Sequence, residues 1–109
     1  MTMVAYGLLA AAIVSEVAGT LALRVAAHGR TSFYAIVVAG YVLAFGLLSV
    51  SLRHGMPLGV AYGIWSAAGV ALTAVASRAL FDEPLTRRMV MGIALIAAGV
   101  LLVEFGAAA

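Results

Sequence analysis

The chain has 109 residues, of which 66% are hydrophobic and 9% are charged, and its mean hydropathy is +1.21. A soluble domain carries roughly 25% charged residues, so this chain lacks the polar surface that water requires and must have lipid as its main solvent. The net charge of +2 is too small to indicate nucleic-acid binding, and the absence of cysteine excludes disulfides and thiol chemistry.

Four apolar segments follow one another along the chain. Because a helix rises about 1.5 Å per residue, roughly 20 apolar residues cross the hydrocarbon core of a bilayer. The segments are residues 4–23, 33–52, 57–77 and 87–105. They do not alternate as strands would, and four strands would not close a barrel. The sequence therefore predicts an all-α membrane protein in which residues 1–109 form a single four-helix transmembrane bundle.

The first segment contains one acidic residue, Glu16, slightly past its middle. An acid there costs about 2.5–3.5 kcal/mol on insertion scales. The alternative is a structural acid paired with a buried base. Every arginine and histidine lies at a segment end or in a loop, so no such base is available. A lone buried carboxylate is stable with a proton and also attracts cations. Glu16 is therefore predicted to bind either one, in space left by small residues on its helix face: Ala12, Gly19 and Thr20.

Aromatic residues inside the second and third segments provide the other half of a cation site. Tyr41 lies in the second segment, and Tyr62, Trp65 and Ser66 lie in the third. Aromatic faces attract organic cations by about 0.5–2 kcal/mol. The alternative is the interfacial belt of membrane proteins, but Trp65 lies near the middle of its segment. We therefore interpret Tyr62 and Trp65 as ligand-facing.

The breaks between segments are short and polar, so consecutive helices are antiparallel neighbours. Pro57 is expected in the first turn of the third helix and Thr86 as the N-cap of the fourth. His28 and His54 lack metal-ligand spacing and are interpreted as loop residues, so no metal is predicted. The first and third loops together carry five arginines, and the second loop carries only Arg53. Because positive loops stay in the cytoplasm, the first and third loops are predicted to be cytoplasmic and both termini to be outside.

Four helices enclose little space, so we expect at least a dimer. In the fourth segment Gly92 and Gly99 are seven residues apart and share one stripe, which favours a dimer contact through close helix approach. The alternative is packing of the same small residues within one copy.

Three motifs in order resemble the small multidrug resistance family of bacterial exporters, over essentially the full chain. The first segment has Ser15-Glu16-Val17-Ala18-Gly19-Thr20, followed by Arg24, and the third has Pro57-Leu-Gly59-Val-Ala61-Tyr62-Gly-Ile-Trp65-Ser66. The fourth has Gly92-Ile-Ala-Leu-Ile-Ala-Ala-Gly99-Val100, which is similar to the dimerising stripe of the family.

The resemblance implies an antiparallel dimer in the bacterial inner membrane that exports hydrophobic cations in exchange for protons, with no cofactor. Glu16 matches the shared glutamate of the family, and Tyr41, Tyr62 and Trp65 match its aromatic surround. The residues that match the lining of the site are Ala12, Ile13, Gly19, Thr20 and Ser66. The guanidinium-exporting branch has a bulky aromatic residue near the position of Gly19, so the resemblance favours quaternary-ammonium and multidrug cations.

Three departures from the family pattern affect these expectations. A Gly-x-Gly bend is usual after Trp-Ser, but this chain has Ala67-Ala68-Gly69, so the hinge is expected at Gly63 and Gly69. Glu104 stands where a neutral polar residue is common. Homodimers of the family have nearly balanced loop charge, so the bias here predicts one half of a heterodimer. A guanidinium exporter, a non-catalytic subunit of a partner transporter and a small pore remain as alternatives.

Overall fold

The computed structural model describes residues 2–108, and these form four long helices and one short helical turn. They are α1 (Thr2–Ala27), the 3-10 turn η1 (Thr31–Phe33), α2 (Tyr34–Arg53), α3 (Leu58–Phe81) and α4 (Arg87–Ala108). All four long helices are long and apolar enough to cross a membrane, and the described residues include no strand. The predicted class, an all-α membrane protein with four spans, is confirmed.

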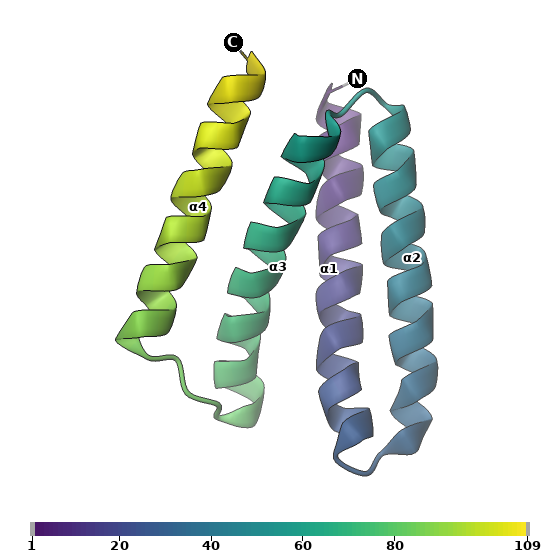
Figure 1. The fold of residues 1–109 in the computed structure, drawn as a ribbon. Helices are drawn as coiled ribbons and strands as arrows, with labels where there is room; N and C mark the ends of the chain where they lie inside the picture. The colour runs from purple at the N-terminus through teal and green to yellow at the C-terminus, as the bar shows by residue number, and fades with distance from the viewer. Residues whose placement is uncertain (1, 109) are drawn as a thin grey trace. The chain divides into compact units, whose positions relative to one another are not determined.

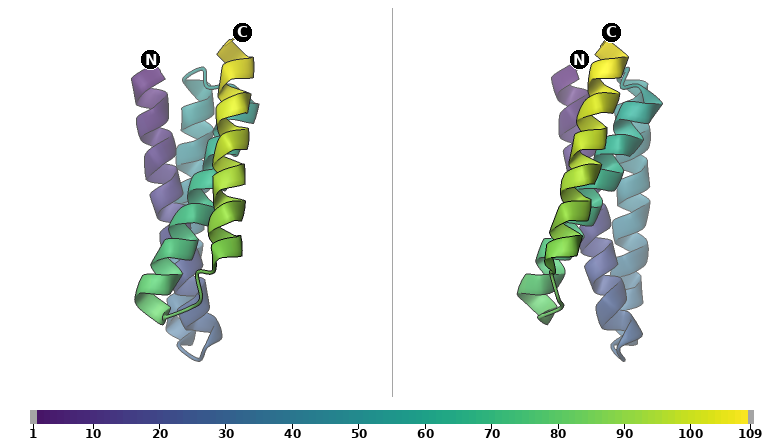
Figure 2. Two further views of the ribbon diagram at one scale, coloured as in Figure 1. Left: turned by 90° about the vertical axis from the view of Figure 1, so that its left-hand side faces the viewer. Right: turned by 60° about the vertical axis from the view of Figure 1, so that its left-hand side comes forward.

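The described chain divides after Met56 into two compact units, each of which is a helical hairpin. In the first, α1 and α2 run antiparallel and are joined through η1 (Figure 1). In the second, α3 and α4 run antiparallel and are joined by an extended connection (Figure 2). The hairpins follow from the short polar breaks between apolar segments. The expectation of one four-helix domain stays a prediction.

The helices α1 and α3 extend beyond the predicted segments because arginine is compatible with the last turn of a membrane helix. α1 continues to Ala27 and includes Arg24 in its last turn, and α3 continues to Phe81 with Arg78 in its last turn. A long arginine stem packs on apolar surface while its charge reaches the polar interface, and a positive charge suits a helix C-terminus. α4 continues to Ala108, past the predicted end at residue 105.

Each helix boundary has a local physical cause. After α1 and α2 the chain turns at Gly29 and Gly55, whose φ angles of 120° and 95° favour glycine. His28 and His54 lie in these turns, and the Nδ1 of each bonds a carbonyl four residues back, of Arg24 and Val50, at 2.8 and 2.9 Å. The structure thus gives both histidines a partner in their own helix.

Pro57 and Thr86 directly precede the third and fourth helices. Thr86 has its expected role, whereas Pro57 lies before the first turn of α3 and not within it. Pro57 is the N-cap of α3 and precedes its first turn; its carbonyl accepts the Ala61 N–H at 3.0 Å. The Thr86 hydroxyl oxygen accepts the backbone N–H of Met89 at 3.2 Å, so its predicted capping role is confirmed. α3 ends at Asp82, whose φ of 53° is left-handed and is tolerated by aspartate.

The two helices of the first unit approach each other closely at glycine. A Cβ atom on Gly40 of α2 would lie 3.0 Å from the Ser15 carbonyl oxygen and 3.1 Å from the Gly19 Cα of α1. No larger side chain fits between the two backbones there without a shift. Small residues give membrane helices this kind of approach, and it sets the register of the residues that follow Gly19 and Gly40.

Candidate functional site

Glu16 lies within α1 and is partly buried, and its two carboxylate oxygens have different surroundings. Oε1 accepts a hydrogen bond from the Thr20 hydroxyl, one helical turn later, at 3.2 Å. Oε2 is buried and has no hydrogen-bond partner among the described residues. Buried polar atoms are nearly always paired, so the Oε2 atom is an exception among the described residues.

Thr20 also contacts α2, through the hydroxyl of Tyr41. The two hydroxyl oxygens are 2.7 Å apart, and either atom is able to donate. A threonine hydroxyl has one proton. When Thr20 donates it to Glu16, the bond between the two hydroxyls is donated by Tyr41. A continuous chain then runs from Tyr41 through Thr20 to Glu16.

The backbone of α1 at Gly19 makes room for the Tyr41 ring. A Cβ atom on Gly19 would lie 3.2 Å from both Cδ1 and Cε1 of that ring. The ring therefore lies against the α1 backbone, and its hydroxyl reaches the next residue, Thr20. Gly40, directly before Tyr41, lets α2 come close enough for this contact.

The other predicted lining residues of α1 are almost completely buried. Ala12 is 0% exposed and Ile13 is 5% exposed, and both lie within one turn before Glu16. Ser15, directly before Glu16, donates a hydrogen bond to the Ala11 carbonyl oxygen at 2.9 Å. In the first unit the structure thus brings together Glu16, Thr20, Gly19 and Tyr41, all of them predicted site residues.

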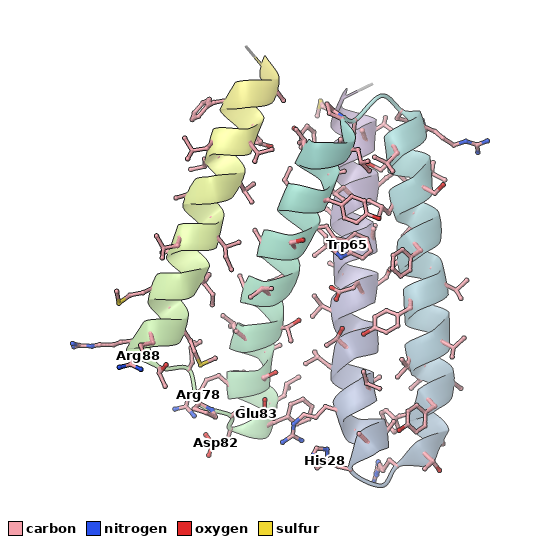
Figure 3. The ribbon with its side chains drawn as sticks, viewed as in Figure 1. His28, Trp65, Arg78, Asp82, Glu83 and Arg88 are labelled. Atoms are coloured by element: carbon pink, nitrogen blue, oxygen red, sulfur yellow. The ribbon has the colours of Figure 1, made fainter. Side chains whose placement is uncertain are left out.

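The remaining predicted site residues lie on α3 in the second unit. Tyr62 is three residues before Trp65 and four before Ser66, so it shares a helix face with both. Tyr62 is 47% exposed, Ser66 is exposed and Trp65 is half-buried. Figure 3 shows Trp65 on α3, well away from the helix ends. Its predicted ligand-facing role remains a prediction.

The glycines of the second unit are in different surroundings. A Cβ atom on Gly63 would lie 3.8 Å from Val100 Cγ2, which is ordinary contact between α3 and α4. Gly92 borders a groove of about 240 Å³ between these helices, with Val70, Ala74, Met89, Ile93 and Ile96. Gly99 is exposed, with no atom within 4 Å of an added Cβ. α3 continues through Gly63 and Gly69 as one helix, so the hinge and the dimer stripe stay predictions.

Charged side chains gather at the connection between α3 and α4. Arg78 and Asp82 form an exposed ion pair, Glu83 lies in the connection, and Arg88 lies in the first turn of α4 (Figure 3). Glu104 lies late in α4 and is half-buried. Among the described residues no group of three or more His, Cys, Asp or Glu side chains is placed to hold a metal ion.

Sequence analysis did not identify two features of this site, the Thr20–Tyr41 hydrogen bond and the close contact at Gly40. The pattern that relates to both is a glycine directly before a hydroxyl residue in each helix, Gly19-Thr20 and Gly40-Tyr41. The pattern alone does not give the register between two helices, which the structure supplies.

The chain is similar to known proteins over most of its length. The sequence pattern of the family described as Small Multidrug Resistance protein matches residues 4–96. The Multidrug transporter PA4990 of Pseudomonas aeruginosa is 39% identical over 91% of this chain and 90% of its own length. Multidrug resistance protein EbrA of Bacillus subtilis is 38% identical over 94% and 98% of the two chains. Multidrug resistance protein EbrB of Bacillus atrophaeus is 42% identical over 88% and 82%.

These matches cover nearly the whole chain and include the segments that hold Glu16, Tyr41 and Trp65. Together with four helices that are able to cross a membrane, they identify a multi-pass membrane protein, and the chain belongs to the Small Multidrug Resistance protein family.

Proposed function

We propose that this protein is a multidrug efflux transporter that exchanges protons for hydrophobic cations, with Glu16 as the group that binds one or the other. The observation that carries the proposal is the buried Oε2 atom of Glu16, which has no hydrogen-bond partner among the described residues. An acid in a membrane helix is costly and is retained for function. A proton and an organic cation each neutralise the same carboxylate, so binding of one releases the other. No cofactor besides the coupling proton is required.

The substrate class follows from what surrounds the carboxylate. Gly19 leaves little space for a larger side chain, because an added Cβ would lie 3.2 Å from the Tyr41 ring. A bulky aromatic residue, which the guanidinium branch has near this position, would require the Tyr41 ring to move. Tyr62 and Trp65 offer aromatic faces on one side of α3. These features support hydrophobic or quaternary-ammonium cations over guanidinium.

We further propose that the active form is an antiparallel dimer in the bacterial inner membrane. None of the described residues of α4 is buried in a single chain, and Gly99 is open on its surface. Such a helix faces either lipid or a second chain, and small residues favour close helix approach in membranes. Gly92 and Gly99 are the proposed contact.

The proposed partner is a family member with the opposite charge bias. The first and third loops carry five arginines and the second loop carries one, which supports a cytoplasmic location for the first and third loops and both termini outside. A chain with so fixed an orientation needs an inverted partner to form an antiparallel pair. Bacillus subtilis has two similar proteins, named EbrA and EbrB, 38% and 41% identical to this chain, which supports a paired arrangement. A homodimer is the alternative.

The function is tested in proteoliposomes that contain the chain alone or with a family member of opposite charge bias. Uptake of radiolabelled tetraphenylphosphonium is measured with and without an imposed pH gradient. We expect uptake that depends on the gradient, and its loss in Glu16→Gln, which keeps the shape of the side chain but does not titrate. Glu83→Gln, an acid-to-amide change in the loop before α4, is the matched control and retains transport.

The other outcomes identify the competing functions. Gradient-driven uptake that survives in Glu16→Gln overturns the role of Glu16. Cation flux that does not depend on the pH gradient indicates a pore. Preference for guanidinium over tetraphenylphosphonium indicates the small-cation branch. No transport by the wild-type chain, alone or paired, indicates a subunit that modulates another transporter.

A further inference from the structure

We propose that Tyr41 is a positioning residue that acts through Thr20, and that the two carboxylate oxygens of Glu16 have separate roles. The hydrogen bonds from Tyr41 to Thr20 and from Thr20 to Glu16 form a relay that holds Oε1. The other oxygen, Oε2, is the atom that binds the proton or the cation. The proposal rests on the proposed function, in which Glu16 is the exchange group, and adds to it the residues that orient that group.

The hydrogen bonds define a direction for the relay. Thr20 lies 3.2 Å from Oε1 and 2.7 Å from the Tyr41 hydroxyl, so it is the common member of both bonds. An ionised carboxylate only accepts hydrogen bonds. The Thr20 proton therefore points to Glu16 and the Tyr41 proton points to Thr20, and both dipoles are oriented toward the carboxylate.

The same geometry leaves Oε2 for the ligand. The relay uses Oε1, whereas Oε2 is buried without a hydrogen-bond partner in the described part of the chain. Holding one oxygen fixes the rotation of the carboxylate and therefore the direction in which the other oxygen points. A ligand then meets an oriented acceptor, and less side-chain freedom is lost on binding.

The position of Tyr41 is set by the backbones of two helices. Its ring lies against α1 at Gly19, and the approach of α2 depends on Gly40. The hydroxyl is thus placed by packing and has little freedom to turn toward other partners. The other ionisable side chains of α1 and α2 lie toward the helix ends: Tyr6, Arg24, Tyr34 and Arg53.

This placement gives Tyr41 a role that its aromatic character alone does not predict. One side of the ring is occupied by the α1 backbone, and the hydroxyl is hydrogen-bonded to Thr20. Loss of the hydroxyl, with the ring kept, should therefore impair the site. If Tyr41 acted by cation–π contact alone, phenylalanine would replace it without loss.

The test is equilibrium binding of tetraphenylphosphonium to the full-length chain with its partner in lipid nanodiscs. Tyr41→Phe and Thr20→Val each remove one hydroxyl and keep the size of the side chain. We expect Tyr41→Phe to weaken binding by about 3–10-fold, the range for one lost hydrogen bond between uncharged groups, and Thr20→Val to weaken it more, because the Thr20 hydroxyl also donates to the carboxylate. Thr20→Ser restores the hydroxyl and is expected to bind as wild type does. Tyr34→Phe, at the start of α2, is the matched control and changes nothing.

The double variant separates a relay from two independent contacts. Because Tyr41 acts through Thr20, we expect Tyr41→Phe with Thr20→Val to bind no more weakly than Thr20→Val alone. Additive losses, or a Tyr41→Phe variant with wild-type affinity, overturn the relay. A Thr20→Ser variant as weak as Thr20→Val also overturns it, because that result assigns Thr20 to packing.

The same variants distinguish failure of the relay from failure of the proposed function. If Glu16→Gln retains gradient-driven transport, the proposed function fails. If Glu16→Gln loses transport while Tyr41→Phe binds as wild type, the function stands and the relay fails. In the Glu16→Gln background, we expect Tyr41→Phe to have no further effect on binding.

Discussion

The Ser51 hydroxyl of α2 donates a hydrogen bond of 2.7 Å to the Ala5 carbonyl oxygen of α1, and Ser51 is 0% exposed. This bond joins the end of α2 to the start of α1, at the end of the hairpin opposite its connecting loop. Its oxygen also lies 3.9 Å from the Met56 sulfur. The two helices are thus held together at both ends of the first unit.

Ser51→Ala is therefore expected to destabilise the first hairpin. Interhelical hydrogen bonds in membrane proteins contribute about 0.6 kcal/mol on average, and up to about 1.7, so a loss of about 0.5–1.5 kcal/mol in the free energy of unfolding is expected. The measurement is an unfolding titration in mixed micelles, followed by helix content. Ser49→Ala, at an exposed position of α2, is the control and should leave stability unchanged. Equal losses in both variants would contradict the prediction.

Gly40→Ala is expected to disturb both the stability and the site of the first unit. The added Cβ would lie 3.0 Å from the Ser15 carbonyl oxygen, so α2 must move away. Overpacking of this kind costs about 1–3 kcal/mol. The shift also moves Tyr41 away from Thr20, so tetraphenylphosphonium binding should fall by at least as much as in Tyr41→Phe.

Gly46→Ala provides the matched control for this prediction. Gly46 is on the same helix, and an added Cβ there has no atom within 4 Å. Alanine has a higher helix propensity than glycine, so this variant should be as stable as wild type or more so. If Gly40→Ala and Gly46→Ala had the same stability, the close approach of α1 and α2 would have no energetic importance.

The sequence predicts one contact of the site, Glu16–Thr20, and does not predict the other, Thr20–Tyr41. Residues four apart on one helix share a face whatever the helix packs against, so the sequence predicts that Thr20 lies beside Glu16. Tyr41 is on another helix, and its height relative to Thr20 depends on how closely the backbones approach. That approach is fixed by Gly40, and the sequence pattern Gly40-Tyr41 does not give the distance between the two helices.

The helix bounds differ from prediction for a related reason. Apolar length predicts where lipid ends, but α1 and α3 continue for a turn beyond, through Arg24 and Arg78. The N-cap of α4 is more predictable than the helix ends, because Thr86 caps the helix through a hydrogen bond to a residue only three positions later. The number and order of the spans depend on composition, and these were predicted correctly.

Thr86→Ala is expected to weaken the start of α4. The variant removes the hydroxyl oxygen that accepts the Met89 N–H at 3.2 Å, and loss of such a cap costs about 0.5–2 kcal/mol. Hydrogen exchange of the first turn of α4 measures the effect at the site, and faster exchange is expected there. Thr86→Ser keeps the oxygen and should exchange as wild type does. Faster exchange in both variants would assign the effect to packing.

If the chain pairs with an inverted partner, the charge bias of its loops, and not the residues of its site, should prevent it from transporting cations alone. Arg30, Arg87 and Arg88 are exposed at the loops that carry the bias. Their replacement by glutamine reduces the count from five against one to two against one. Because orientation follows this count, a reporter fused after Ala109 should then be active on both faces of the membrane, whereas in the wild-type chain we expect it to be active only outside.

The same triple variant should also gain transport without a partner, because a chain that inserts both ways forms its own antiparallel pair. Arg53→Gln is the control, since it changes the count to five against zero and should leave the orientation fixed. If the wild-type chain already transports tetraphenylphosphonium alone, with its reporter active on both faces, the heterodimer proposal is wrong. If the triple variant inserts both ways but stays inactive, a partner supplies more than orientation, and the shared site around Glu16 needs residues that this chain lacks.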